Sequence, residues 1–319
     1  MPRISIILGK SSNEKSIFEK SLEYQHFTDY ELIITGISYA EKNIGLKRAT
    51  GEYVFFPEPW MEISENALKV MTQGMQPKLR IADASNSVTS SSDVTIDLVA
   101  AGYEILAEDE SGALEKVYET PERNSRVIEK EDFLSRILYP AHDQGMIWNK
   151  LFRRSIIAAH DISFDEDIYY EAERLFLVKY LTHAFETRQI SDKLLFYNTS
   201  EVVDWPSDEL FRDELSEEEL VKAAWELHKR TVTEVEVYIR MRKLLRKVPD
   251  AKWLAEQTAV YTMLMIFVQM LDAGEGDFYK KSPLRKYAKK AKRLDYSAST
   301  AEDEALLNML LEFGRTGRI

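Results

Sequence analysis

The strongest concentration of one charge in the sequence lies near its C-terminus. Residues Lys280–Arg293 hold eight basic side chains among fourteen, interleaved with or flanked by Phe278, Leu284, Tyr287 and Leu294. In a chain of net charge −12 this is a marked local asymmetry. Such a segment can be attracted to the anionic lipids of a membrane surface. The alternative is a solvated face that pairs with the acidic stretch Asp208–Glu219.

The cysteine content and the histidine spacing exclude several kinds of chemistry. The chain has no cysteine, so thiol catalysis, thiolate metal sites and disulfides are ruled out. The histidines at positions 26, 160, 183 and 228 have no metal-ligand spacing with each other. The sequence therefore predicts no metal site built on cysteine or histidine.

Composition indicates a soluble globular protein. The chain has 319 residues, of which 45% are hydrophobic and 30% charged, enough for one large or two ordinary domains. Its acidic balance argues against general nucleic-acid binding, which needs clustered cations. The strongest apolar run, Tyr261–Leu271, is shorter than the roughly 20 residues that span a bilayer. We therefore expect a cytoplasmic protein, with the inner membrane face as an alternative location.

The first half of the chain alternates between short apolar runs and helical segments. Buried strands are expected at Ile4–Leu8, Glu31–Thr35 and Tyr53–Phe56, with helices at Glu14–Tyr24, Ala40–Ala49 and Ser64–Met71, the last capped by Ser64. Strands that alternate with helices form a parallel sheet. Ligands of such sheets bind beyond the carboxyl ends of the strands, so we expect the site in the loops after Leu8, Thr35 and Phe56.

The second half changes from mixed patterns to helical ones. After β-type runs at Thr95–Val99 and Glu104–Leu106, five helices are expected at Asp208–Leu227, Val232–Lys247, Ala251–Asp272, Ser282–Leu294 and Thr300–Phe313. Pro206 interrupts the chain where the patterns meet, within Val203–Ser207. The sequence therefore predicts an α/β domain at 1–204 and an all-α domain at 205–319.

Three groups of residues carry a resemblance to a known family. They are Ile4–Leu8 with Asn13-Glu14; Asn43–Leu46 with Ala49–Phe56 and Asn66-Ala67-Leu68; and Trp148–Arg154 with Phe164–Asp167 and Lys179-Tyr180-Leu181. Together they resemble glycosyltransferase family 2, and the third group resembles bacterial cell-envelope and teichoic-acid transferases. The resemblance covers about 1–200. It implies a GT-A fold, the Rossmann-like domain of nucleotide-diphospho-sugar transferases.

The resemblance also implies where a donor would bind. A GT-A enzyme usually holds a nucleotide diphosphate through a divalent metal with carboxylate ligands. The family's Asp-x-Asp motif falls on Glu58-Pro59-Trp60, where an indole replaces one carboxylate, and its base-binding acids fall on Gly36-Ile37. A UDP- or CDP-sugar is the implied donor, with contacts at Gly9, Lys42, Asn43 and Glu58. Glu58 is either a ligand for Mn²⁺ or Mg²⁺ or an exposed loop acid, and no complete metal site is expected.

Two further residues are implied as catalytic. The family's general-base pair falls on Ala172-Glu173, so Glu173 is the candidate base for an acceptor hydroxyl; the alternative is a surface acid at a helix start. Lys150 is a candidate for offsetting acceptor or leaving-group charge. Because scaffold positions match the family and chemical ones do not, we expect a glycosyltransferase-like protein with a degenerate donor site.

Three functions follow from these observations. The preferred one is a non-catalytic partner or regulatory subunit of a second glycosyltransferase in surface-glycan synthesis. The alternatives are an active, metal-independent transferase and an interaction module built on the helical region. Because the run Tyr261–Leu271 is apolar nearly all round, the helical region is also a candidate for homo-oligomer contacts.

Overall fold

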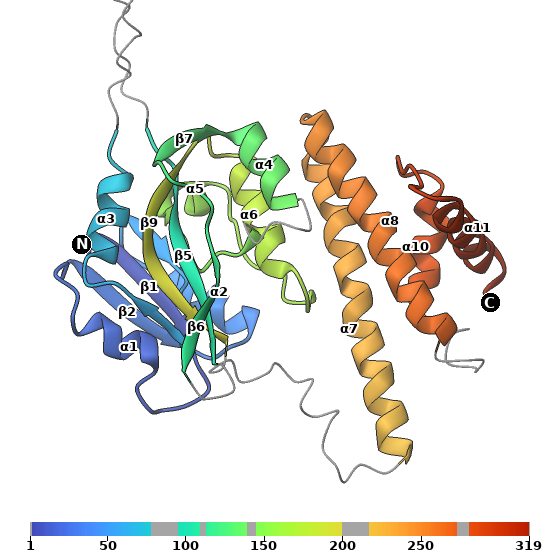
Figure 1. The fold of residues 1–319 in the computed structure, drawn as a ribbon, viewed down its shortest axis with the longest axis horizontal. Coiled ribbons are helices and arrows are strands. Elements are labelled where there is room, and N and C mark those ends of the chain that lie inside the picture. The colour runs from blue at the N-terminus through green and yellow to red at the C-terminus, as the bar shows by residue number, and fades with distance from the viewer. Residues whose placement is uncertain are drawn as a thin grey trace, which may run out of the picture. The chain divides into compact units, whose positions relative to one another are not determined.

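The computed structural model describes residues 2–77, 95–108, 113–138, 145–199, 217–272 and 281–318. The chain forms two compact units, one of residues 1–133, 146–164 and 180–203 and one of residues 134–145, 165–179 and 204–319 (Figure 1). The second unit thus includes two short segments that the sequence places in its first domain. The division between the units falls after residue 203, at the start of the predicted junction Val203–Ser207. The residues of that junction lie outside those that the structure describes.

The first unit is built on one mixed sheet. Its described strands are β1 (Ile4–Gly9), β2 (Tyr30–Thr35), β3 (Tyr53–Phe55), β4 (Met61–Ile63), β5 (Leu98–Glu108), β6 (Leu114–Glu119), β7 (Arg126–Glu129), β8 (Lys150–Arg153) and β9 (Glu186–Asn198). Their order is β2-β1-β3-β8-β5-β9-β4, with β6 beside β5 and β7 beside β9. β1 pairs in parallel with both β2 and β3, which confirms the parallel arrangement predicted for the first three strands.

The middle of the sheet corrects one prediction. The two runs predicted at Thr95–Val99 and Glu104–Leu106 belong to one long strand, β5, which starts at Leu98. The residues between the runs are buried as well, and β5 pairs with β9 along most of its length. Gly102 marks a shift in that register, where a Cβ atom would lie 2.7 Å from the carbonyl oxygen of Asp192.

The described helices between the strands and before β9 are α1 (Ile17–Leu22), α2 (Tyr39–Arg48), α3 (Ala67–Gly74), α4 (Lys130–Leu138), α5 (Arg154–Ala159) and α6 (Ala172–Leu181). The first unit holds α1, α2, α3 and α5, whereas α4 is divided between the units and most of α6 belongs to the second. α1 and α2 each begin with a capping box, in which Ser16 pairs with Glu19 and Ser38 with Glu41. The cap predicted at Ser64 is wrong, since α3 begins after Asn66. The N–H of Ser64 instead donates to the carbonyl of Leu194, at 2.9 Å.

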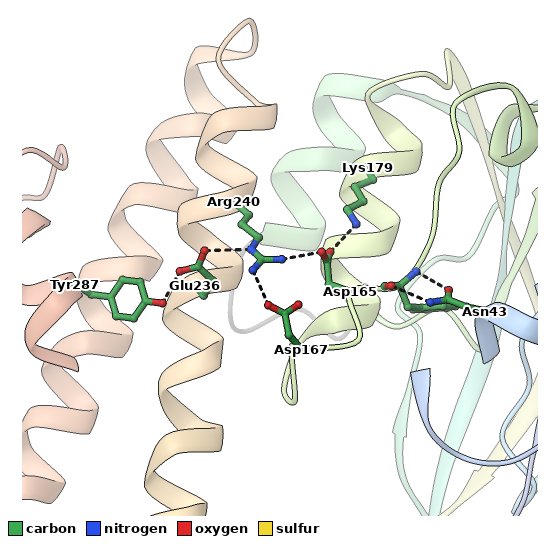
Figure 2. Close-up of polar contacts among 8 residues, drawn as sticks. Asn43, Asp165, Asp167, Lys179, Glu236, Arg240 and Tyr287 are labelled. Carbon is green, nitrogen blue, oxygen red and sulfur yellow. Dashed lines mark hydrogen bonds and ion pairs between the residues drawn. The ribbon is translucent and has the colours of Figure 1, made fainter. Parts of the chain in front are cut away.

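Asn43 braces α2 against a distant part of the same unit. Its side-chain NH₂ donates to the carbonyl of Phe164 at 3.0 Å, and its side-chain oxygen accepts from the N–H of Phe164 at 2.9 Å (Figure 2). All of these atoms are buried. One amide thus satisfies both polar groups of a backbone position that is 121 residues away.

Asn43→Ala is expected to lower the free energy of unfolding by about 2 kcal/mol, because it leaves a buried N–H and a buried carbonyl without this partner. Chemical denaturation followed by circular dichroism measures the loss. Asn308→Ala, at an exposed position of the second unit, is the control and should change stability by less than about 0.5 kcal/mol. Equal losses in both variants would contradict the bracing role.

The second unit is helical in its described C-terminal part. Its helices are α7 (Glu217–Leu244), α8 (Pro249–Asp272), α10 (Leu284–Ala291) and α11 (Ala301–Thr316). The predicted break between Leu227 and Val232 is wrong, because α7 runs through it unbroken. The hydroxyls of Thr231 and Thr233 donate to carbonyls of their own helix, so these β-branched residues are accommodated. The predicted start at Asp208 lies outside the described residues.

One described helical stretch, Pro249–Leu271 in α8, is long and apolar enough to cross a membrane by length and composition. It is longer than the run Tyr261–Leu271 noted in the sequence. However, 61% of its most apolar window is buried inside the structure, as in the core helix of a globular protein. Tyr261 and Met265 are exposed, so the burial is not complete on every side.

Candidate functional site

The carboxyl end of β1 is where the sheet reverses its order. The chain passes from β1 to β2 on one side and then crosses back to β3 on the other, and ligands of open α/β sheets bind at such a switch point. Gly9 ends β1, and Glu58 follows β3 by a few residues. Two of the four predicted donor-contact residues therefore lie at the position expected for a ligand site.

A buried ion pair occupies this position. The ammonium of Lys42 lies 3.4 Å from a carboxylate oxygen of Glu58, with side chains that are only 6% and 16% exposed. The Lys42 stem passes beside Gly9, where a Cβ atom would lie 3.5 Å from Cε of the lysine. The structure thus brings Gly9, Lys42 and Glu58 together. Asn43, the fourth predicted residue, is instead engaged with the backbone of Phe164.

In the loop after β2, a side chain at Gly36 would meet the side chain of Glu41. A Cβ atom there would lie 2.2 Å from the carboxylate oxygens of Glu41. That carboxylate is held by the capping box of α2, since it accepts from the hydroxyl of Ser38 at 2.7 Å. A side chain at position 36 would displace the end of the exposed Glu41 side chain and with it part of this cap. The residue at this position, glycine, carries no carboxylate for a base.

The loop Glu58–Trp60 is held from several sides. The carbonyl of Pro59 accepts from the N–H of Phe18 at 3.1 Å. The Trp60 ring packs edge-on against Tyr197 at 6.2 Å between centroids, and Tyr197 stacks on Trp148 at 5.2 Å. Trp60 is therefore partly buried and packs against the core of the sheet.

The residues at this position do not fit a divalent metal. A hard cation needs several oxygen ligands, whereas Glu58 is the carboxylate here and an ammonium faces it. The described part of the chain contains no group of three or more His, Cys, Asp or Glu side chains that could hold a metal ion.

Lys150, predicted as catalytic, is buried in the first unit. It is 1% exposed, and its ammonium donates to the carbonyl of Met146 at 2.5 Å and to the side-chain oxygen of Asn149 at 2.7 Å. Asn149 in turn donates to the carbonyl of Ala101 at 3.0 Å. These bonds tie the start of β8 to β5, so the lysine serves the scaffold in this structure.

Glu173, the predicted base, lies in the first turn of α6 in the second unit and is half-buried. Lys150 belongs to the first unit. The neighbour of Glu173, Arg174, is buried and donates to the carboxylate of Glu171 at 2.5 Å and to the carbonyl of Ile137 at 2.6 Å. The backbone of Glu171, the residue before α6, is in the left-handed conformation, with φ at 63°.

Two acids that precede Glu173 in the sequence, Asp165 and Asp167, belong to an ion-pair network (Figure 2). Arg240 of α7 binds Asp165 at 2.7 Å, Asp167 at 3.0 Å and Glu236 at 3.1 Å. The hydrogen bond from Arg240 holds the pKa of Asp167 below its ordinary value. Lys179 binds Asp165 from the other side, at 2.5 Å. These carboxylates are therefore charged and paired.

A second buried cluster was not predicted from the sequence. Burial in the second unit, with the nearby charge of Glu171, raises the pKa of Glu234 to about 7, although Arg174 opposes the shift. Burial also raises the pKa of Tyr238. Glu234 and Tyr238 are four residues apart on α7 and so share a face, which is a signal that the sequence contains. The groups that act on them, Glu171 and Arg174, are at least 60 positions away in the sequence, and no spacing rule identifies them.

Comparisons with known proteins agree on the fold. No protein-family model matches the chain, and no curated protein matches it in sequence. Three solved structures of S. aureus TarS, residues 1–349, are similar. The complex with UDP has a TM-score of 0.53 at 15% identity, that with UDP-GlcNAc 0.51 at 16%, and TarS alone 0.52 at 14%. Each covers 99% of this chain and 92% of the TarS chain.

At this identity the likeness is one of fold, and it extends through the helical region. The parallel β1, β2 and β3, the mixed sheet around them and the helices after residue 216 agree with the sequence-based expectation. The chain therefore has a GT-A glycosyltransferase fold, with a Rossmann-like α/β part followed by a helical C-terminal region.

Proposed function

We propose that this chain is a glycosyltransferase-like protein of cell-envelope or surface-glycan synthesis that acts as a non-catalytic partner of a second transferase, on the cytoplasmic side. The similarity to TarS, which was solved with UDP and UDP-GlcNAc, supports the choice of process and of UDP-sugars as the ligands to test. The comparison of folds alone does not distinguish an active transferase from an inactive relative. That distinction depends on the donor position.

The single observation that carries the non-catalytic proposal is the Lys42–Glu58 ion pair. It fills the switch point with side chains of the chain itself, at a place where a GT-A enzyme holds the metal and diphosphate of its donor. Trp60 and Gly36 carry no carboxylate at the two other positions where the family resemblance implies donor contacts. A nucleotide sugar would have to displace a buried ion pair to enter, and that costs binding free energy.

A metal-independent transferase is the second candidate, and the same ion pair supplies its argument. An ammonium at the carboxyl end of a parallel strand can offset the charge of a diphosphate without a metal. In this candidate Lys42 turns from Glu58 toward the donor. The family resemblance implies Glu173 as the base for the acceptor hydroxyl. The two candidates therefore differ in whether a nucleotide sugar binds at all.

Thermal shift measurements with UDP, CDP and UDP-GlcNAc separate the two candidates. In EDTA and in Mn²⁺, the non-catalytic partner should show a change in melting temperature below about 1 °C. A ligand present at a hundred times its Kd would stabilise by about 2.7 kcal/mol and so raise the melting temperature by several degrees. A rise of that size in EDTA would overturn the preferred proposal in favour of the second candidate. A rise seen only with Mn²⁺ would contradict both.

Turnover provides a second readout. If a nucleotide sugar binds, Glu173→Gln should abolish transfer and leave the thermal shift unchanged, whereas Glu302→Gln should change neither. Glu302 is a suitable control because it is an exposed acid in the first turn of α11. If none binds, addition of the full chain should raise the turnover of the partner transferase with which it co-purifies. If no nucleotide sugar binds and the full chain does not raise the turnover of a partner transferase, the proposed function is overturned.

A further inference from the structure

The basic segment seen in the sequence divides into two faces in the structure. On α10 the apolar side chains Leu284, Tyr287, Ala288 and Ala291 are buried in the second unit. Six described basic residues of the segment are exposed, and one of them, Lys286, lies over a ring of the same helix. The other five are Lys281, Lys289, Lys290, Lys292 and Arg293, and we call them the basic face. The apolar side of the helix is thus used in folding, while the cations remain in water.

The basic face has no ion-pair partner among the residues that the structure describes. The two other described cations of the segment are used within the unit, since Arg285 donates to the carbonyl of Arg315 and Lys286 lies over the ring of Tyr287. Lys289 and Lys290 also favour the C-terminal end of α10 through its dipole. That effect does not account for Lys281 or for the cations beyond the helix end. The side chains of the acidic stretch Asp208–Glu219 lie outside those described.

An exposed stripe on α8 runs past the end of this segment. Trp253, Tyr261 and Met265 are 43%, 53% and 45% exposed, and their spacing of eight and four residues places them on one side of the helix. Gln257, midway between the first two, donates to the carbonyl of Asp295 and accepts from the N–H of Ser297. The stripe therefore lies beside the residues that directly follow Arg293.

We propose that the basic face and the exposed α8 stripe form one surface that binds anionic phospholipid headgroups, so that the protein lies on a membrane without crossing it. Lysine and arginine side chains are attracted to the negative potential of such a surface. Trp and Tyr side chains favour the headgroup level. Most of α8 is buried within the protein, which leaves the stripe for shallow contact only.

Charge favours an anionic membrane over a second copy of the chain or a nucleic acid as the partner of this surface. A second copy of the chain would bring the same cations face to face in a symmetric contact, which is repulsive. A nucleic acid would meet a protein whose remaining charge is strongly negative, since the whole chain carries −12. An anionic membrane can contact the basic face, and salt screens the repulsion from acidic groups that lie more than the Debye length of about 8 Å from the membrane.

Co-sedimentation of the full chain with vesicles tests the proposal. Binding is expected to vesicles of phosphatidylglycerol mixed with phosphatidylcholine, to weaken as salt is raised, and to be absent with phosphatidylcholine alone. Each cation near an anionic surface contributes roughly fivefold to partitioning. Neutralising Lys289, Lys290, Lys292 and Arg293 together to Gln should therefore lower the partition coefficient by roughly two orders of magnitude or more.

A matched control separates the surface from net charge. Neutralising the exposed Lys20, Lys47, Arg48 and Lys69 of the first unit removes the same number of lysines and arginines and should leave binding unchanged within about twofold, since these cations lie off the proposed surface. Trp253→Ala with Tyr261→Ser should weaken the binding that remains at high salt. Equal losses in the two charge variants, or no preference for the anionic lipid, would overturn the proposal. The proposal would also be overturned if the protein bound no lipid and the same variants abolished self-association or the binding of an acidic protein.

Discussion

Lys42→Met is expected to lower the free energy of unfolding by about 3 kcal/mol, because it leaves the Glu58 carboxylate buried without the ammonium that faces it. Removing one member of a buried ion pair typically costs about 3 to 5 kcal/mol, and we take the low end because Glu58 is 16% exposed. Methionine retains the length of the lysine stem, so little of the loss comes from packing. Urea denaturation of wild type and variant measures the difference.

Two further variants make this result specific. The double variant Lys42→Met with Glu58→Leu should recover most of the loss, since a buried ion pair replaced by apolar side chains is often neutral or stabilising. Lys47→Met, an exposed cation on the same helix, should change stability by less than about 0.5 kcal/mol. A loss below about 1 kcal/mol for Lys42→Met would show that water already solvates the pair. The switch point would then be open to a ligand, and the second candidate function would gain support.

Glu234→Gln is expected to stabilise the protein at pH 8 by about 2 to 3 kcal/mol and to have almost no effect near pH 4.5. Burial and the nearby Glu171 raise the folded-state pKa of Glu234 to about 7, against an ordinary value of 4.5. Between these values the folded state holds a proton that the unfolded state has released. Stability from this group is therefore complete below the unfolded pKa and is lost as pH rises through the folded one.

The size of the effect follows from the shift. Each pKa unit corresponds to about 1.4 kcal/mol, so a shift of this size amounts to about 3 kcal/mol at high pH. Gln mimics the protonated acid and does not lose a proton. Unfolding curves at pH 5 and pH 8 provide the comparison, with the exposed Glu226→Gln on the same helix as the control. Parallel pH profiles for wild type and Glu234→Gln would contradict the buried position of this carboxyl group.

Local patterns in the sequence predict the parts of the fold that depend on neighbouring residues. The strands β1 and β3 were predicted as buried because short apolar runs are typical of strands covered on both faces, and both are buried. The prediction of a buried strand was wrong for β2, which lies at the end of the strand order and is buried only at Ile33. The helical character of the second unit was predicted from the helical spacing of its apolar residues. The unbroken α7 was missed, because its Thr231 and Thr233 are stabilised by bonds that propensity rules do not count.

Residue identity alone determined what the donor position lacks, because an indole at Trp60 and a hydrogen at Gly36 can supply no carboxylate wherever the chain places them. What the remaining residues do was decided by tertiary structure. Lys42 became the partner of Glu58 through the crossover between β2 and β3, and Asn43 became a brace for a backbone position 121 residues away. Each of these partners lies far along the chain, and only the packed sheet and its helices bring them within bonding distance.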